Sequence, residues 1–414
     1  MQKPPMLSVA EALDVLLAAP RPLVDAAATE LVPTLSANGR ILADAQVSRL
    51  NVPPADNTQM DGYAVRAADC ASGAAGGARL PVSQRIPAGH VGAPLQAGTA
   101  ARIFTGAMIP DGADAVVMQE MCEADGDAVV IKHAPAAGEW VRRAGEDIRS
   151  GSVILPAGTR LRPQHLGLAA SVGLEALPVL RKLRVAMFFT GDELAMPGQP
   201  LKPGAIYNSN RFVLRGLLEN LGCEISDYGI VPDNREATRE ALRLAAQEHD
   251  LILTSGGVSV GEEDHVKPAV EAEGRLNMWQ IAMKPGKPLA FGEVRRAAGG
   301  TAFFIGLPGN PVSSFVTFLI FVRPFILRQQ GVAASGLAPQ AVTMRADFDW
   351  PKADRRQEFL RAKINADGGL DLFPQQGSGV LTSTVWGDGL VDNPAGKTIT
   401  KGDFLRFLPF SAFL

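Results

Sequence analysis

Glycine and lysine residues in two loops of the central part of the chain could bind an anion. Gly256 and Gly257 follow the apolar run DLILT, and a helix is expected to begin near Asp264. Glycine lets the backbone approach a ligand and point amide groups at it, and a helix N-terminus adds partial positive charge. Lys284 and Lys287 supply cationic donors on the stiff turn MKPGKP. These features predict a site for a phosphorylated, anionic small molecule.

Carboxylates occupy the same group of loops, at Asp192, Glu193, Asp233 and Asp264. They would repel a bound anion unless a divalent cation lay between them. Mg²⁺ is a hard cation that takes oxygen ligands. We therefore expect Mg²⁺ as a cofactor, with Glu193, Asp233 and Asp264 as its ligands.

Structural roles are the alternative for several of these residues. In DNRE, Asp233 stands where a helix N-cap would, three residues before Glu236, which is the spacing of a capping box. Asp192 can be a turn residue. Pro308 and Pro311 can end a strand and start a helix, since proline is favoured in a first helical turn. The functional interpretation depends on the loops occurring together rather than on one residue.

An α/β domain must position these loops. Between residues 183 and 327 the apolar runs LRVAMFF, EISDYGI, DLILT, NMWQIAM and AFFIG alternate with amphipathic helical segments. This alternation predicts a doubly wound, mostly parallel sheet. Such sheets bind ligands outside the carboxyl ends of their strands. The loops TGDEL, VPD, SGGVSVGEED, MKPGKP and LPGNPVS each follow one of the runs, so we expect all five at one sheet edge.

The rest of the chain predicts a multi-domain α/β protein. Ser8 and Glu11 have the spacing of a capping box before the first helix. Short β-like runs and Gly, Pro and Asp turns predict small β domains elsewhere. The expected domains are a mainly helical N-terminal unit at 1–50 plus 146–180, an inserted β-rich domain at 51–145, the α/β domain at 181–330 and a small C-terminal β-barrel at 331–414.

Composition excludes several classes of function. The 414 residues carry 40 basic and 43 acidic side chains, for a formal charge of −3. No basic block could neutralise nucleic acid or an acidic membrane. The three cysteines are far apart, so they predict neither disulfides nor a zinc site, and they favour a reducing, cytoplasmic location. The five histidines lack metal-ligand spacing, so we expect none to be catalytic.

No signal peptide or membrane span is predicted. The opening residues MQKPPMLSVAEAL lack a basic segment followed by an apolar one. The apolar run FVTFLIFV at 315–322 is broken by Arg323 and Pro324, short of the about 20 residues that a span needs. A buried helix is the prediction.

The order of the loop motifs closely resembles the molybdopterin molybdenumtransferase family, which includes the C-terminal region of gephyrin. The motifs are TGDEL, TSGGVSVGEED, KPGKPLAFG and GLPGNPVS, with MDGYAVR, RIFTGAMIPDGADAVVMQE and GEDI upstream and EFLRA and GSGVLTS downstream. The resemblance covers nearly the whole chain. One departure is DNTQ before MDGYA, where a Ser-Ala pair is common in the family, but Asp61 is kept.

The resemblance implies a homodimer with an elongated N-terminal dimerisation domain and a shared active site. In that arrangement the inserted domain of one subunit faces the α/β domain of the other. The implied reaction takes adenylylated molybdopterin and molybdate, releases AMP and leaves molybdenum on the dithiolene, with Mg²⁺ assisting. A molybdopterin adenylyltransferase is the implied donor of the substrate.

The family's functional residues carry over to matching positions. The implied catalytic residues are Glu193, Asp61, Thr105, Asp147, Asp233 and Asp264, with Thr105 as a hydrogen-bond donor and Glu193 as the indispensable carboxylate. The implied substrate-binding residues are Ser255, Gly256, Gly257, Ser259, Lys284, Lys287, Pro308 and Pro311. Lysines and loop amides would hold phosphates and molybdate, and carboxylates would hold the cation.

Two other functions are open to this sequence. One is a scaffold that clusters a partner, as the related gephyrin domain does; a scaffold would not need the acidic and lysine residues. The other is a different nucleotide-handling enzyme on the same α/β domain, which the flanking MDGYA and FTGA motifs disfavour.

Overall fold

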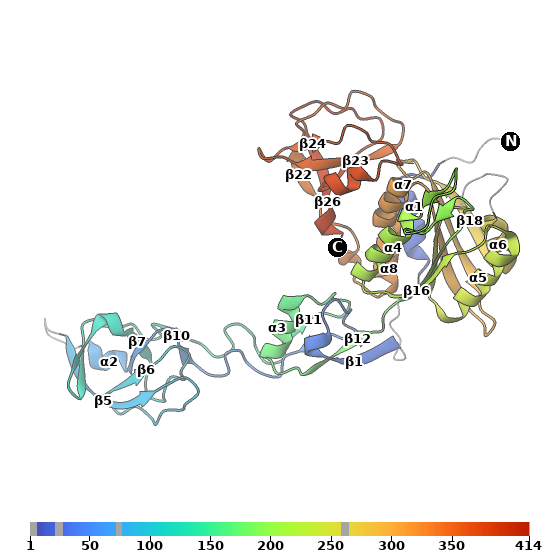
Figure 1. Ribbon diagram of the computed structural model, residues 1–414. Helices are drawn as coiled ribbons and strands as arrows, with labels where there is room; N and C mark the ends of the chain where they lie inside the picture. Colours follow the sequence, from blue (N-terminus) through green and yellow to red (C-terminus); the bar gives the residue numbers. More distant parts are fainter. Residues whose placement is uncertain (1–5, 21–27, 72–76, 258–264, 414) are drawn as a thin grey trace.

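The computed structural model describes residues 6–20, 28–71, 77–257 and 265–413. The chain forms an elongated molecule of several domains (Figure 1). A β-rich domain lies at one end, and the α/β domain and a C-terminal β domain lie at the other. A small unit of two-stranded ribbons and a helix lies between them. The prediction of a multi-domain α/β chain is confirmed.

A six-stranded sheet forms the centre of the α/β domain. In spatial order its strands are β16 (Glu224–Ile230), β13 (Arg184–Phe189), β17 (Leu251–Ser255), β21 (Thr301–Leu307), β20 (Pro288–Arg295) and β18 (Gly274–Gln280). β16, β13, β17 and β21 are parallel, whereas β20 runs antiparallel to β21 and β18. The sheet is therefore mostly parallel. The sequence pattern does not predict β20, which begins at Pro288, the last residue of the turn MKPGKP.

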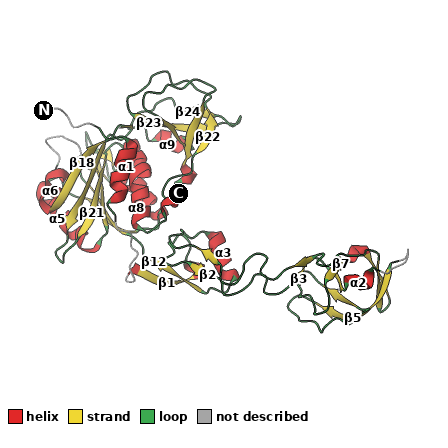
Figure 2. Ribbon diagram, turned by 180° about the vertical axis from the view of Figure 1, so that it is seen from behind, coloured by secondary structure: helices red, strands yellow, loops and turns green. Residues whose placement is uncertain are grey.

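Both faces of this sheet are buried under helices. Val185, Met187 and Phe189 of β13 belong to one hydrophobic cluster, whereas Ala186 and Phe188 belong to another, because successive strand residues point to opposite faces. Helices α1 (Val9–Ala18), α4 (Ser209–Asn220), α7 (Pro311–Thr317) and α8 (Arg323–Gln329) cover the first face, and α5 (Arg235–Glu248) and α6 (Val266–Glu273) cover the second (Figure 2). This layering makes the domain doubly wound.

A helical segment of 19 residues runs from Pro311 to Gln329 and is long and apolar enough to cross a membrane by length and composition alone. However, 83% of its most apolar window is buried inside the protein, so the prediction of a buried helix is confirmed. The helical structure continues through Arg323 and Pro324, where the apolar run is interrupted. A π-helical turn, Phe318–Val322, leads directly into α8, and its shifted hydrogen bonding accommodates a proline that lacks an N–H.

The first helix belongs to the α/β domain rather than to the N-terminal unit. Its capping box is present: Ser8 Oγ accepts from the Glu11 N–H at 3.2 Å, and Glu11 Oε2 accepts from the Ser8 N–H at 2.8 Å. Its apolar face of Val9, Ala12 and Leu16 packs in the same cluster as α8. This packing corrects the predicted domain of residues 1–50.

The N-terminal unit is built mainly from β ribbons. Its elements are β1 (Thr29–Pro33) paired with β12 (Ala176–Leu180), β2 (Gln46–Val47) paired with β11 (Val153–Leu155), and helix α3 (Pro163–Ser171). The expectation of mainly helical structure up to residue 50 is therefore wrong after α1. Local Ala- and Leu-rich composition favours a helix, but pairing with strands more than a hundred residues later overrides it.

The inserted domain is a six-stranded sheet with a short ribbon. In spatial order the sheet contains β7 (Ala115–Met118), β4 (Gly62–Val65), β6 (Ala100–Ile103), β5 (Ala78–Ile86), β9 (Ala128–Ile131) and β8 (Cys122–Asp125). The domain also contains a ribbon of β3 (Asn57–Thr58) with β10 (Val141–Arg142), and helix α2 (Ala67–Cys70). Separate apolar clusters pack on the two faces.

The C-terminal domain extends its sheet with a strand from the α/β domain. The spatial order is β19 (Met283–Lys284), β23 (Gln357–Ile364), β25 (Gly389–Asn393), β26 (Phe404–Pro409) and β22 (Val342–Arg345), with β24 (Leu370–Leu372) beside β23 and helix α9 (Thr382–Trp386) nearby. A bridge between Ala346 and Leu370 joins the two sides of the sheet, which gives it a barrel-like closure. The parallel pairing of Lys284 with Glu358 is central to the site below.

The segment that enters β13 is anchored by a bidentate ion pair. Arg181 Nη1 and Nη2 donate to Asp250 Oδ2 and Oδ1 at 2.7 and 2.8 Å, and the Arg184 N–H donates to Oδ2 at 2.9 Å. Burial raises the pKa of Asp250, but the hydrogen bonds from Arg181 and Arg184 outweigh it and hold that pKa below its usual value.

Asp250→Asn is expected to destabilise the protein by about 2 kcal/mol at neutral pH, because it breaks a buried, hydrogen-bonded pair. Since the folded pKa lies below the unfolded value, the stabilisation is complete above about pH 4 and is lost as pH falls through the folded pKa. Urea unfolding across this range measures the difference, with Asp125→Asn in the exposed pair with Arg79 as control. A difference that stays constant as the pH falls would contradict this assignment.

Candidate active site

A cavity of about 750 Å³ opens at the carboxyl edge of the parallel strands. Several loops that the sequence predicts at this edge line it, together with part of the C-terminal domain. Its lining residues include Thr190, Glu193, Asn208, Asn210, Ser255, Gly256, Gly257, Lys284, Lys287, Pro308, Pro311, Ser313, Arg356, Gln376, Gly377 and Ser378. The predicted convergence of these loops is therefore present.

The glycine pair after β17 lies against the neighbouring loops. Gly256 has a φ of 96° and Gly257 a φ of 62°, which favour glycine. A Cβ at Gly257 would lie 2.6 Å from the Val266 side chain and 2.8 Å from Thr190 Oγ1. Any larger residue at Gly257 would therefore displace a wall of the cavity.

Ser255 holds the two central loops together. Its Oγ donates to the Pro308 carbonyl at 2.9 Å and accepts from Asn210 Nδ2 at 2.8 Å, and Asn210 also donates to the Gly309 carbonyl at 2.8 Å. The side chain of Ser255 is buried. These bonds indicate that the Ser255 hydroxyl positions the loops rather than contacting a ligand freely.

Both predicted prolines line the cavity. Pro311 is also the first residue of α7, so the structural alternative for it is confirmed alongside its place in the wall. Pro308 directly follows β21. The same residues thus start the helix and shape the cavity.

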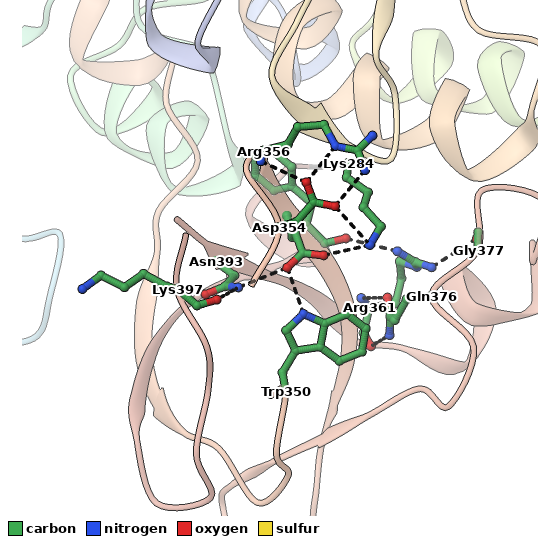
Figure 3. Close-up of polar contacts among 11 residues, drawn as sticks. Lys284, Trp350, Asp354, Arg356, Arg361, Gln376, Gly377, Asn393 and Lys397 are labelled. Carbon is green, nitrogen blue, oxygen red and sulfur yellow. Dashed lines mark hydrogen bonds and ion pairs between the residues drawn. The ribbon is translucent and has the colours of Figure 1, made fainter. Parts of the chain in front are cut away.

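Lys284 is held by acidic residues of the C-terminal domain (Figure 3). Its Nζ lies 3.0 Å from Glu358 Oε1 and 3.6 Å from Asp354 Oδ2. The Glu358 side chain is 1% exposed, compared with 35% for Lys284. Trp350 Nε1 donates to Glu358 Oε2 at 2.8 Å. The pairing of β19 with β23 brings the lysine and glutamate side by side.

Lys287 and Arg356 complete the cationic part of the cavity. Arg356 Nε and Nη2 donate to Asp354 at 2.9 and 2.8 Å, and hydrogen bonding by Arg356 holds the pKa of Asp354 far below its usual value. Within the described residues Lys287 makes no ion pair. Lys287 is therefore the cation most available to an incoming anion.

A loop of the C-terminal domain forms the opposite wall. Gly377 and Ser378 line the cavity, and the Ser378 carbonyl accepts from the Val312 N–H at 3.0 Å. Arg361, fully buried, donates to the Gly377 carbonyl at 3.2 Å (Figure 3). It also donates to Ser383 Oγ at 3.1 Å. Sequence reasoning placed no site residue in this domain, although the motifs EFLRA and GSGVLTS contain Glu358, Arg361 and Ser378.

Glu193 is exposed and lines the cavity. Its backbone carbonyl accepts from the Ile206 N–H at 2.8 Å, which ties the ribbon of β14 (Leu194–Ala195) and β15 (Ile206–Tyr207). A Cβ on Gly191 would lie 2.6 Å from Glu193 Oε2, so the carboxylate lies directly against the Gly191 backbone. Nearby, the buried Thr190 Oγ1 has no hydrogen-bond partner among the described residues.

The other predicted metal ligands are placed differently. Asp233 follows β16 at the outer edge of the sheet and is not among the lining residues. The helix cap is Asn234, whose side chain accepts from the Ala237 N–H at 2.9 Å, so the capping alternative for Asp233 is wrong. Asp264 and Ser259 lie outside the described residues.

Asp61 and Thr105 meet in the inserted domain. The N–H and Oγ1 of Thr105 both donate to Asp61 Oδ1, at 2.7 and 2.6 Å. These bonds lower the pKa of Asp61. Asp147 is exposed in the segment between β10 and β11. The inserted domain lies at the opposite end of the molecule from the α/β domain (Figure 1), so Asp61 and Thr105 are far from the cavity of their own chain.

Glu358→Gln is expected to lower the free energy of unfolding by about 2 kcal/mol, because it leaves Lys284 without its buried counter-charge. The matched control is Glu271→Gln on the exposed side of α6, expected to change stability by less than about 0.5 kcal/mol. Chemical unfolding of both variants checks this. Equal effects at the two positions would show that the Lys284–Glu358 pair contributes nothing to stability.

The fold and the cavity define a multi-domain protein with a cavity lined by lysine and arginine side chains at an α/β sheet edge. Three family models match consecutive parts of the chain. They are the MoeA N-terminal region (domain I and II) at residues 7–173, the probable molybdopterin binding domain at 186–328 and the MoeA C-terminal region (domain IV) at 343–410.

Relatives match along nearly the whole length. A molybdopterin molybdenumtransferase of Haemophilus influenzae is 39% identical over 396 residues, covering 92% of this chain and 95% of the relative. One of Synechococcus elongatus is 37% identical, covering 95% and 96%. A crystal structure of a molybdopterin biosynthesis moeA protein from Pyrococcus horikoshii has a TM-score of 0.84 at 30% identity, covering 98% of this chain and 100% of that one. The chain belongs to the molybdopterin molybdenumtransferase family and is a transferase of molybdenum cofactor biosynthesis.

Proposed function

We propose that the protein transfers molybdenum from molybdate to adenylylated molybdopterin and releases AMP. The observation that carries this proposal is the cavity that combines Lys284, Lys287 and Arg356 with a glycine loop and one exposed carboxylate, Glu193. Cationic side chains and loop amides bind phosphate and oxyanions. A cavity of about 750 Å³ is in the range of sites for small organic ligands.

Different residues of the cavity would bind the two anions of this reaction, the oxyanion and the phosphates of the adenylylated substrate. Lys284, Lys287 and Arg356 line the same cavity as Gly377 and Ser378 and suit the compact oxyanion. The glycine loop after β17 suits the phosphates, because its backbone can approach them closely. Holding both anions in one cavity brings the reacting groups together, which lowers the entropic part of the barrier.

The described residues fit Mg²⁺ held jointly by protein and substrate. Glu193 would supply a carboxylate oxygen, and Thr190, which also lines the cavity, has a hydroxyl without a hydrogen-bond partner among the described residues. Mg²⁺ usually binds through one or two carboxylates plus substrate phosphates rather than in an all-protein cage. When bound, the ion would stabilise negative charge on the phosphate oxygens. Asp233 and Asp264 remain Mg²⁺ ligands predicted from the sequence.

We also propose that the active site is shared between the subunits of a homodimer. Asp61 and Thr105 form a hydrogen-bonded pair at the far end of the molecule from the cavity (Figure 1). A rigid chain cannot bring them to its own cavity, whereas a second copy in the opposite orientation can. A closed twofold dimer would then contain two equivalent composite sites.

A reducing, cytoplasmic location is part of the proposal. All three cysteines are unbonded, and burial raises the pKa of Cys223 to about 12. A molybdopterin adenylyltransferase would supply the adenylylated substrate, since the reaction consumes the product of such an enzyme.

The proposal is tested with purified protein, adenylylated molybdopterin, molybdate and Mg²⁺. The readout is the activity gained by an added molybdenum-free apoenzyme. We expect activation that requires both the protein and molybdate. A protein that acts only as a scaffold would give no activation above the rate of the mixture without protein, which would refute the proposed function.

A further inference from the structure

A second cavity, here called the basic cavity, lies where the N-terminal unit, helix α8 and the end of the chain meet. Its volume is about 610 Å³. Three segments line it: the residues before α3 with the start of that helix, helix α8 with the residues after it, and the end of β26 with the residues that follow. The three segments come from different domains (Figure 1), and the cavity shares no lining residue with the active-site cavity.

Three arginines and one histidine line the basic cavity: Arg160, Arg162, Arg323 and His165. Backbone carbonyls rather than carboxylates hold the arginines. Arg323 Nε donates to the Phe413 carbonyl at 2.8 Å, and its Nη1 donates to the Leu337 carbonyl at 2.9 Å. Arg160 Nη2 donates to the Asn220 carbonyl. These bonds fix the guanidinium groups in place without neutralising their charge.

The cavity has no counter-charge among its described lining residues, since none of them is Asp or Glu. Arg323 is only 6% exposed. Burial and the neighbouring Arg160 lower the pKa of Arg323 to about 10, and burial and Arg162 lower the pKa of Arg160. Buried charges in proteins are usually paired, because an uncompensated charge is costly away from water. An anion bound in the cavity would supply a counter-charge.

The start of α3 adds to this positive field. Arg162 is the N-cap of this nine-residue helix, and helix N-termini carry partial positive charge. His165 Nδ1 accepts from the Arg162 N–H at 3.0 Å. A neutral His165 ring must then carry its proton on Nε2, which makes that nitrogen a donor.

We propose that the basic cavity binds a phosphate-class oxyanion, either inorganic phosphate or the phosphate group of a nucleotide. Arg160 and Arg162 of the N-terminal unit and Arg323 of α8 hold it from two domains. A bound anion therefore fixes the orientation of the N-terminal unit against the α/β domain. This site is independent of the proposed reaction, since it uses none of the active-site residues.

Calorimetric titration of the full-length protein with inorganic phosphate and with AMP tests the proposal. The Lys284→Gln/Lys287→Gln background removes cations of the active-site cavity from the measurement. In that background we expect Arg160→Gln/Arg162→Gln to weaken phosphate binding at least about tenfold, because two charge-assisted donors are lost. AMP binding that is tighter than phosphate binding and is weakened by Arg160→Gln/Arg162→Gln identifies a nucleotide as the ligand, whereas equal affinity of the Arg160- and Arg162-dependent binding identifies free phosphate.

The matched control is Arg79→Gln/Lys132→Gln, which removes the same charge from exposed ion pairs of the inserted domain. It is expected to leave phosphate affinity unchanged. The proposal would be overturned if both double variants weakened phosphate binding equally. It would also be overturned if the Lys284→Gln/Lys287→Gln protein showed no saturable phosphate binding.

Arg162→Glu provides a second test that does not depend on loss of binding alone. Arg162 is exposed, so the fold should tolerate the substitution. The new carboxylate would act as an internal counter-charge for Arg160. We expect a higher melting temperature without phosphate and no further rise on adding it. A lower melting temperature together with retained phosphate binding would refute the site.

Discussion

Replacing Glu193 with alanine is expected to reduce molybdate-dependent AMP release by at least about 100-fold, which is the size of effect seen when a group that stabilises transition-state charge is removed. Glu193 is exposed, and its structural bond to Ile206 uses the backbone carbonyl, not the side chain. The substitution should therefore leave the melting temperature and the oligomeric state unchanged.

The neighbouring residue supplies the matched control for this prediction. Asp192 is also an exposed carboxylate of the same turn, but it does not line the cavity. Asp192→Ala should retain activity within about twofold, whereas Glu193→Gln should be nearly as inactive as Glu193→Ala if the charge is required. Near wild-type AMP release by Glu193→Ala would disprove the catalytic assignment.

Mixing two inactive variants is expected to restore activity. Asp61→Ala damages the inserted-domain half of the proposed shared site, and Glu193→Ala damages the cavity half. In a heterodimer one site carries both substitutions and the other carries neither. Random exchange between equal amounts makes half of the dimers heterodimers, so about one quarter of the wild-type activity should return, as the twofold symmetry requires.

Variants damaged in the same half must not complement each other. Glu193→Ala mixed with Lys287→Ala should stay inactive, because every site then lacks a residue of the cavity. Both mixtures are assayed without fractionation after co-expression with two different affinity tags, and co-purification of the two tags shows that heterodimers have formed. If Asp61→Ala with Glu193→Ala gave no more activity than this control, the shared site would be excluded.

Local sequence patterns predict the α/β domain well because its strands and helices are each specified by neighbouring residues. The strands β13, β16, β17 and β21 coincide with apolar runs. Parallel pairing then brings their carboxyl ends together, and the loop positions follow from the topology alone. For this reason the sequence alone predicts that the loops of Glu193, Gly256 and Pro308 meet at one sheet edge.

Contacts between distant segments account for what the sequence does not predict. The pairing of Lys284 with Glu358 depends on the strand register of β19 and β23, 74 residues apart, and no local pattern encodes it. The alternative cap at Asp233 fails for a subtler reason. Asn234, one residue later, is an equally good cap, and only the position where α5 begins decides between them.

Simultaneous measurement of AMP released and molybdenum bound tests the proposed reaction most directly. The purified protein is given adenylylated molybdopterin and Mg²⁺, with molybdate, with tungstate or with neither oxyanion. We predict one AMP released for each molybdenum retained on the dithiolene, and negligible release without an oxyanion. Equal AMP release with and without molybdate, or molybdenum retained with no AMP released, would contradict the proposed function.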